Sequence, residues 1–387
     1  MRLSDRMSRL GTESAFEVLA RARKLEAAGR TVVHLEIGEP DFDTPPLISE
    51  AGIQAIGSGA THYSPSPGID PLRNAIAEHV SSTRKISVGP GQVVVTPGAK
   101  PILFFTLLAL AQEGDEVLYP NPGFPIYESM INFVGAKAVP IPLREDLYFE
   151  LDPDELRSLV TPRTRLIILN SPQNPTGGVL TRETLSAVAD VAIENDLTVL
   201  TDEIYRDIVY GTVSPSITEL PGMVERTIIL DGFSKIYAMT GWRLGFGVMP
   251  EELTPHISRL VTNSVSCTAT FVQEAGITAL SRTHSEIAQM LSEFRRRRET
   301  IVNGLNAVDG ITCLWPAGAF YVFPNVKQLG IHSKEFSNRL LDEAGVATLA
   351  GNDFGTYGDG FIRLSYANSI ENIQEALDRI SRFAASL

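Results

Sequence analysis

The chain has 387 residues, of which 43% are hydrophobic and 20% charged, and its formal net charge at pH 7 is −13. This length exceeds one compact core and predicts two domains or one large α/β unit. The negative charge argues against nucleic acid and anionic membranes as partners, unless a local basic patch compensates. The one dense basic run, Arg295 to Arg298, falls in a long helical stretch, where we expect a solvated face.

The cysteine content and the apolar runs of the sequence favour a cytoplasmic location. Cys267 and Cys313 form no C-x-x-C pair, so we expect neither a zinc site nor a disulfide framework. Two scattered thiols suit a reducing cytoplasm. The opening residues, MRLSDRMSRL, have no apolar core, so we expect no secretory signal there. No run approaches the roughly 18 apolar residues that span a bilayer.

The elements follow in chain order. A helical pattern over residues 13–28 stands outside the sheet pattern, and we expect it to pack on a smaller unit or on a neighbouring subunit. Apolar runs then alternate with helical patterns. Runs without polar alternation indicate strands buried on both faces, and intervening helices indicate a mostly parallel sheet. Seven strands are predicted, over residues 92–96, 116–120, 136–140, 165–170, 198–203, 227–233 and 245–249. The helices predicted between them cover residues 100–112, 124–134, 182–195 and 251–264.

The pattern changes near residue 285. One long amphipathic helix is expected there, and after it come short strands and helices typical of a small α+β unit. The expected elements are a helix over 285–307, a strand over 319–324, a helix over 334–344, strands over 346–351 and 361–367, and a helix from 371. We therefore predict a large domain over residues 46–284 and a small domain formed by 1–45 and 285–387.

Polar side chains follow several predicted strands. In open parallel sheets, ligands bind beyond the carboxyl ends of the strands, so these side chains should meet at one edge. Lys235 follows one strand and, if partly buried, could be a deprotonated nucleophile toward an aldehyde. Asp202 ends another, and a protonated pyridine nitrogen would pair with it. Tyr205 and Asn174 could bond the phenolic oxygen of the same ring. The simpler alternatives are a surface lysine, a helix N-cap for Asp202 and a plain turn at Asn174.

Anion-binding groups are also present. Gly98, Ala99 and Lys100 form a glycine turn that runs into a helix N-terminus, which favours a phosphate, although an ordinary strand-to-helix turn looks the same. Arg243 adds a positive charge and Ser234 a hydroxyl. Lys100 is the alternative candidate for the lysine that forms a Schiff base with the aldehyde. We favour Lys235, because Lys100 begins a helix at the predicted phosphate site.

A substrate carboxylate needs a partner of its own. Arg363 lies between Ile362 and Leu364 in an apolar run, and its guanidinium would match a carboxylate at two points. The alternative is a strand arginine that faces solvent.

The motifs resemble those of the class I/II aminotransferases, which depend on pyridoxal 5′-phosphate and include aspartate and aromatic amino acid aminotransferases. The matching segments are EIGEPDFDTP, HYSPSPGIDPLRNAIA, TPGAK, NSPQNPTGG, TDEIY, GFSKIYAMTGWRLGF, AGAFYVFP and FIRLSYANS. They stand in the family's order and cover nearly the whole chain. The resemblance implies an α/β fold of fold type I and a homodimer with shared active sites.

The resemblance also implies residue roles. Lys235 would hold the cofactor as an aldimine and then move a proton between Cα and C4′. Asp202 would pair with the pyridine nitrogen, while Asn174 and Tyr205 would bond the phenolic oxygen. The other cofactor-binding residues would be Gly98, Ala99, Lys100 and Ser234 with Arg243 at the phosphate, Phe124 stacked on the ring, and Tyr63 reaching the phosphate of the partner subunit. Arg363, with Asn174 and the backbone near Gly38, would bind the substrate α-carboxylate.

The sequence departs from the family pattern where specificity is set. Position 124 is phenylalanine where tryptophan is frequent, and no second arginine for a side-chain carboxylate is identified, which argues against strict aspartate specificity. Phe16, Tyr321 and Phe124 could line an apolar pocket. We predict transamination between an amino acid and a 2-oxo acid. A lyase or cyclase on the same scaffold is the alternative, and a pyridoxal-phosphate-binding regulator without activity is a third reading.

Overall fold

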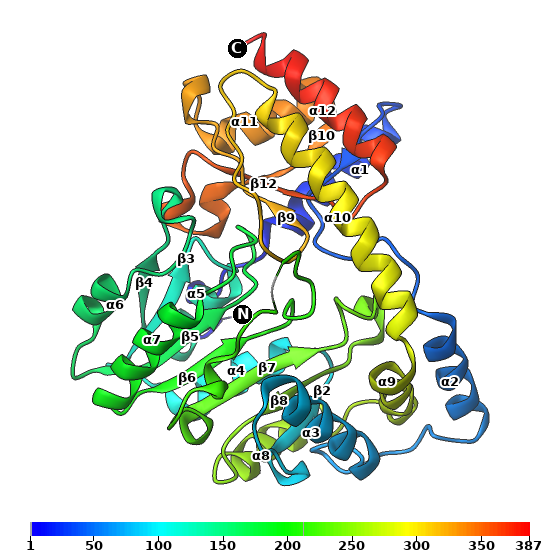
Figure 1. The fold of residues 1–387 in the computed structure, drawn as a ribbon, viewed down its shortest axis with the longest axis vertical. Coiled ribbons are helices and arrows are strands. Elements are labelled where there is room, and N and C mark those ends of the chain that lie inside the picture. Colours follow the sequence, from blue (N-terminus) through cyan, green and yellow to red (C-terminus); the bar gives the residue numbers. More distant parts are fainter. Residues whose placement is uncertain (1, 212) are drawn as a thin grey trace.

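A seven-stranded sheet forms the centre of the computed structural model, which describes residues 2–211 and 213–387 (Figure 1). The strand order is β2-β8-β7-β6-β5-β3-β4. The strands are β2 (Val93–Thr96), β3 (Glu116–Asn121), β4 (Lys137–Pro142), β5 (Thr164–Asn170), β6 (Thr198–Asp202), β7 (Thr227–Gly232) and β8 (Gly245–Val248). β8 is antiparallel to both its neighbours, and the other pairs are parallel. All seven predicted strands and the mostly parallel sheet are confirmed.

Helices cover both faces of this sheet. One apolar cluster joins Val94, Leu166 and Ile228 to α4, α5 and α8, and residues of opposite orientation, such as Val93 and Ile167, pack toward α3, α6, α7 and α9. These helices are α2 (Pro46–Gly57), α3 (Asp70–Arg84), α4 (Lys100–Leu110), α5 (Ile126–Val134), α6 (Pro153–Leu159), α7 (Arg182–Glu194), α8 (Thr254–Ser264) and α9 (Thr270–Arg282). The sandwich explains why the strand residues are apolar on both faces. Four of the helices, α2, α3, α6 and α9, had not been predicted.

A smaller α+β unit lies beside the sheet (Figure 1). It contains a parallel pair, β1-β10, and a three-stranded antiparallel sheet, β11-β12-β9. Its elements are α1 (Ser14–Ala27), β1 (Val33–His34), α10 (His284–Asn306), β9 (Tyr321–Val322), α11 (Ser333–Arg339), β10 (Val346–Ala347), β11 (Leu349–Ala350), β12 (Ile362–Ser365) and α12 (Ile370–Ala384). In Figure 1, α10 (yellow) runs from the helices beside the sheet to this unit, where it packs against α12.

Two expectations for this unit needed correction. The strand predicted over 346–351 is two short strands in different sheets, because Val346 and Ala347 pair with β1 whereas Leu349 and Ala350 pair with β12. The helix predicted over 334–344 ends in a π-helical turn at Leu340–Ala344. The N-terminal helix α1 packs on this unit, where Arg21 donates to the side chain of Asn338 at 2.6 Å. The domain boundaries near residues 46 and 285 remain a prediction.

The basic run on α10 is not a uniformly solvated face, contrary to expectation. Arg295 and Arg296 are exposed, but Arg297 is 6% exposed and pairs with Asp41 at 2.6 Å. Arg298 donates to the carbonyl oxygen of Pro316 at 2.6 Å. The inner side of the run therefore anchors neighbouring segments, since one face of α10 packs against the protein. None of the helices in the described part of the chain combines the length and the hydropathy that a membrane-spanning segment requires.

Candidate active site

A cavity of about 910 Å³ opens where the carboxyl ends of the central strands meet the smaller unit. It is large enough for a cofactor and a small substrate. The predicted site residues that line it are Gly38, Ala99, Lys100, Phe124, Asn174, Asp202, Tyr205, Ser234, Lys235, Arg243 and Arg363. Gly98 lies just behind the lining, against Arg243. Tyr63 is 89% exposed and does not line the cavity, so its role toward a partner subunit remains a prediction.

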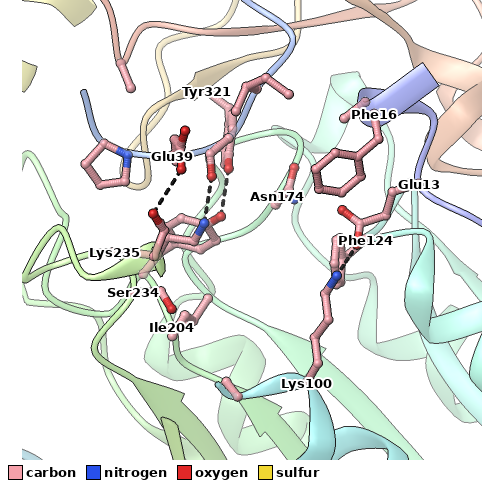
Figure 2. A pocket seen from close by; sticks show the side chains of 18 of the residues that line it. Glu13, Phe16, Glu39, Lys100, Phe124, Asn174, Ile204, Ser234, Lys235 and Tyr321 are labelled. Atoms are coloured by element: carbon pink, nitrogen blue, oxygen red, sulfur yellow. Dashed lines mark hydrogen bonds and ion pairs between the residues drawn. The ribbon is translucent and has the colours of Figure 1, made fainter. Parts of the chain in front are cut away.

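Lys235 follows β7 and is partly buried (Figure 2). Its Nζ donates a hydrogen bond to the carbonyl oxygen of Gly38 at 2.6 Å. Burial lowers the pKa of Lys235 from 10.5 to about 8, although the carboxylate of Glu39 opposes this shift. The interpretation as a surface lysine is therefore wrong. An amine with this pKa is partly deprotonated near neutral pH, which a nucleophile toward an aldehyde requires.

Asp202 ends β6 with 7% of its surface exposed. The hydroxyl of Tyr127 donates to its Oδ2 at 2.7 Å, and the backbone N–H of Ile204 donates to its Oδ1 at 3.2 Å. Burial raises the pKa of Asp202 to about 6, and these two hydrogen bonds oppose the rise. The carboxylate is thus buried without a cationic side chain bonded to it, which leaves room for a cationic partner from a ligand. Sequence reasoning missed Tyr127, because nothing local connects α5 to the end of β6.

Two tyrosines that line the cavity are hydrogen-bonded to each other. The hydroxyls of Tyr205 and Tyr321 are 2.7 Å apart, and either one can donate. Burial raises the pKa of Tyr205 well above its usual value, with Tyr321 adding to the rise. Both phenols are therefore neutral hydrogen-bonding groups beside Lys235, whose Nζ lies 5.8 Å from the ring centre of Tyr205.

Arg363 points inward from β12 and is 4% exposed, so the interpretation as a solvent-facing strand arginine is wrong. One of its terminal nitrogens donates to Asn174 Oδ1 at 3.2 Å, and the other donates to the backbone carbonyl of Glu36. Its Nε is buried and has no hydrogen-bond partner among the described residues. Burial lowers the pKa of Arg363 from its ordinary value, although nearby tyrosines oppose this. A buried guanidinium with an unsatisfied donor and no carboxylate bonded to it favours an anionic ligand.

The turn that is predicted to bind an anion precedes α4. Gly98 has a φ of +85°, which strains any residue with a side chain, and a Cβ at this position would also displace the guanidinium of Arg243, so glycine is favoured there. The first N–H groups of α4 have no partner within the helix and favour an anion. The ammonium of Lys100 has a different neighbour: it contacts Glu13 and lies 5.3 Å from the ring centre of Phe124 (Figure 2).

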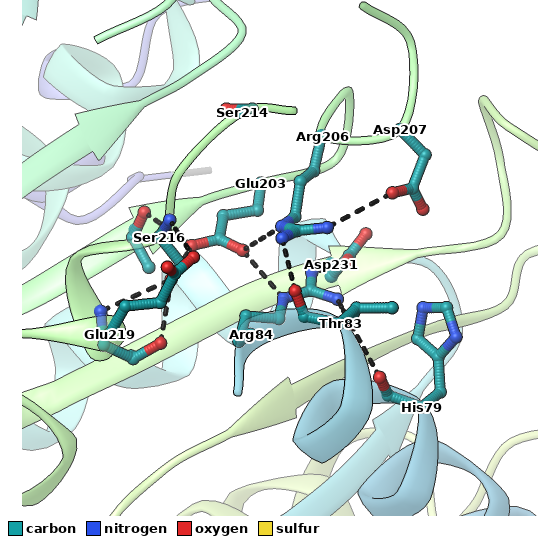
Figure 3. Close-up of polar contacts among 12 residues, drawn as sticks. His79, Thr83, Arg84, Glu203, Arg206, Asp207, Ser214, Ser216, Glu219 and Asp231 are labelled. Atoms are coloured by element: carbon teal, nitrogen blue, oxygen red, sulfur yellow. Dashed lines mark hydrogen bonds and ion pairs between the residues drawn. The ribbon is translucent and has the colours of Figure 1, made fainter. Parts of the chain in front are cut away.

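A buried charge cluster supports the strand ends (Figure 3). Arg84, which has no exposed surface, donates to Glu203 Oε2 at 3.0 Å and to Asp231 Oδ2 at 2.5 Å. Arg206 lies 3.7 Å from the same Glu203 carboxylate. Glu203 follows β6 directly and Asp231 belongs to β7, so these ion pairs fix the two strands that precede the site, one ending at Asp202 and the other leading to Lys235. Among the residues described, no group of histidine, cysteine, aspartate or glutamate side chains could hold a metal ion.

Known proteins resemble this chain in both sequence and fold. The model of the family described as aminotransferase class I and II matches residues 30–380. Aromatic-amino-acid aminotransferase 2 of Thermococcus litoralis is 41% identical over 386 residues, covering 99% of this chain and 98% of that protein. An aspartate aminotransferase of Pyrococcus abyssi is 40% identical over 386 residues, with the same coverage. The solved structure of an aspartate aminotransferase from Thermus thermophilus with maleate is 36% identical, with a TM-score of 0.95, and the match covers 99% of this chain and all of that one.

These findings confirm both the resemblance that the motifs indicated and the fold type I architecture. The identity is high and extends over almost the full length of both proteins, so it concerns the whole enzyme rather than a shared module. The chain belongs to the aminotransferase class I and II family, and it is an enzyme that transfers amino groups.

Proposed function

We propose that the enzyme uses pyridoxal 5′-phosphate to move an amino group between an L-amino acid and a 2-oxo acid by a ping-pong mechanism. The observation behind this proposal is that a lysine of lowered pKa, a buried carboxylate and a buried arginine with a free donor border one cavity. When bound, pyridoxal phosphate supplies an aldehyde and an electron-withdrawing pyridine ring. The residues present fit such a group.

Each end of the cofactor has a proposed partner. Asp202 would hold a proton at the pyridine nitrogen, since a cation there would satisfy a carboxylate that burial otherwise disfavours. Tyr205 and Asn174 would bond the phenolic oxygen, and Phe124, which lines the cavity, would lie against the ring. Lys235 would bind the aldehyde carbon and then move a proton to and from the substrate Cα.

The phosphate would lie at the start of α4. The turn with Gly98, the backbone of Ala99 and Lys100, the hydroxyl of Ser234 and the charge of Arg243 surround that point. We further propose a homodimer in which Tyr63, exposed on a single chain, reaches the second site.

Substrate binding is assigned to the opposite wall. Arg363 would grip the α-carboxylate through its free Nε, with Asn174 and the backbone at Gly38 completing the subsite. The relatives named above act on aspartate or on aromatic amino acids, and we propose L-amino acids of these kinds as the first donors to test. Cys267 and Cys313 form no disulfide, which supports the proposal of a cytoplasmic enzyme.

The test is a half-reaction. The enzyme loaded with pyridoxal phosphate is mixed with an amino acid but no acceptor, and conversion of the cofactor to its amine form is followed by absorbance. Added 2-oxoglutarate should restore the spectrum and yield glutamate. Lys235→Ala should lose both half-reactions, and full turnover in that variant would falsify the assignment. Release of ammonia and pyruvate without an acceptor would instead show a lyase.

A further inference from the structure

One wall of the cavity contains an ion pair that the proposed chemistry does not use. This wall, here called the α1–α4 wall, consists of Glu13, Phe16, Lys100 and Phe124, all of which line the cavity. Glu13 directly precedes α1, and Lys100 is the first residue of α4. The Lys100 ammonium contacts the Glu13 carboxylate beside the Phe124 ring, with Phe16 nearby (Figure 2).

The other cations of the cavity have different neighbours or positions. Arg363 already lies between Asn174 and a backbone carbonyl, with its Nε left for one carboxylate. Arg243 lies against the turn before α4, where the phosphate is proposed. Arg23 lines the cavity from the exposed side of α1. His34 also lines it, and Glu36, which raises the pKa of His34 to about 9, already pairs with it at 2.8 Å. Lys100 lies beside the Phe124 ring, so a second carboxylate on a substrate side chain that packs against this ring would meet Lys100, which already has an anionic partner.

We infer that Glu13 is a specificity-determining residue: by holding Lys100, it directs the α1–α4 wall toward uncharged apolar side chains, aromatic ones above all, and against a second carboxylate. This inference rests on the proposed transamination and narrows its substrate class. An aromatic side chain would contact Phe16 and Phe124 and leave the ion pair intact. A distal carboxylate must displace Glu13 from Lys100 or lie next to a like charge.

The exposure of the pair sets the strength of this selection. The Lys100 side chain is 46% exposed and that of Glu13 is 19% exposed. Such a pair is weak and can open, so dicarboxylates are disfavoured rather than excluded. The field of Glu13 also extends to the α-carboxylate subsite. Burial is the main cause that lowers the pKa of Arg363, and Glu13 is among the smaller ones that raise it.

The test compares two unreactive ligands on the cofactor-loaded enzyme. Glutarate has two carboxylates, and 3-phenylpropanoate has one carboxylate and an aromatic ring. Their dissociation constants are measured by calorimetry for wild type, Glu13→Gln and the double variant Glu13→Gln/Lys100→Met. Glu17→Gln is the matched control, because Glu17 is exposed on the first turn of α1 and does not line the cavity.

Glu13→Gln should bind glutarate about tenfold more tightly, since one charge-assisted contact to Lys100 becomes available. Its affinity for 3-phenylpropanoate should be unchanged. The double variant should lose the gain, and Glu17→Gln should behave as wild type. In half-reactions, the ratio of kcat/KM for glutamate to that for phenylalanine should rise by the same factor in Glu13→Gln.

Three results would overturn the inference: an unchanged glutarate affinity in Glu13→Gln, a gain that persists without Lys100, or a wild type that prefers glutarate to 3-phenylpropanoate. Failure of the proposed function looks different. In that case wild type would convert neither amino acid in the half-reaction, while the binding ratios would still decide the role of Glu13.

Discussion

Replacing Lys235 by methionine should change how the stability of the cofactor-free protein depends on pH. In the folded chain the pKa of Lys235 is about 8, against 10.5 for the unperturbed group, because burial disfavours the ammonium. Below pH 8 both the folded and the unfolded state hold the proton, and burying the charge costs about 3 kcal/mol. Between pH 8 and pH 10.5 the folded state binds fewer protons than the unfolded state, so this cost disappears as pH rises.

Urea unfolding of the cofactor-free protein measures this effect. The free energy of unfolding of wild type, relative to that of Lys235→Met, should rise by about 3 kcal/mol between pH 8 and pH 10.5. Lys24→Met, on the exposed side of α1, corrects for the loss of one lysine. A difference between wild type and Lys235→Met that does not change with pH would refute the account of Lys235 as a buried amine.

The same pKa should govern capture of the cofactor. At pH 7.5 about a quarter of the Lys235 side chains would be free amine, compared with about a thousandth at the unperturbed pKa. The rate at which pyridoxal phosphate binds should therefore level off just above pH 8, as followed by stopped-flow absorbance. A rate that keeps rising to pH 10.5 would contradict this.

Two further substitutions test the groups around the cofactor and the substrate. Tyr127→Phe removes the hydroxyl that donates to Asp202 at 2.7 Å, a charge-assisted hydrogen bond of about 1.5–3 kcal/mol. The pKa of Asp202 should then rise above 6, because this bond opposes the effect of burial. Cofactor affinity, measured by fluorescence titration, should weaken at least about tenfold. Unchanged affinity would show that this bond does not prepare the carboxylate. Arg363→Lys replaces a planar fork by a single ammonium, so kcat/KM should fall at least about tenfold for every amino donor while cofactor affinity stays the same; a loss confined to one donor would point to side-chain recognition instead.

The sheet can be predicted from the sequence because each strand contains a short apolar run that is recognisable without knowledge of the rest of the fold. β2, β3 and β7 are short strands buried at every position, and each contains an apolar run (VVV, VLY or IIL) that is visible in the sequence. The helices that were missed depend more on tertiary packing. α2 lies against α9, and each has a weak apolar stripe that becomes a buried face only when the other is present. α3 differs, because Leu72, Ile76 and Val80 stand four residues apart, a helical spacing that the sequence itself shows.

The residues of the candidate site also fall into two groups: those that local sequence places and those that only tertiary packing places. Asp202 and Lys235 follow strands of one parallel sheet, so the rule that strand ends converge places them together without any knowledge of the fold. No comparable rule predicts the positions of Tyr127 and Glu13. One comes from a helix face and the other from the N-terminal segment, and each meets its partner only because the chain folds back over the sheet edge.

The two groups of residues also differ in their proposed roles: one acts on the cofactor and the other selects the substrate. The positions of groups at strand ends can be predicted from the sequence. These are the groups proposed to act on the cofactor, which stays the same whichever substrate binds. The contact between Glu13 and Lys100 joins the start of α1 to the start of α4, two segments 87 positions apart in the chain. Such a contact depends on how the smaller unit packs against the sheet. Substrate choice in this enzyme should accordingly respond to changes in the N-terminal segment that leave every strand-end residue untouched.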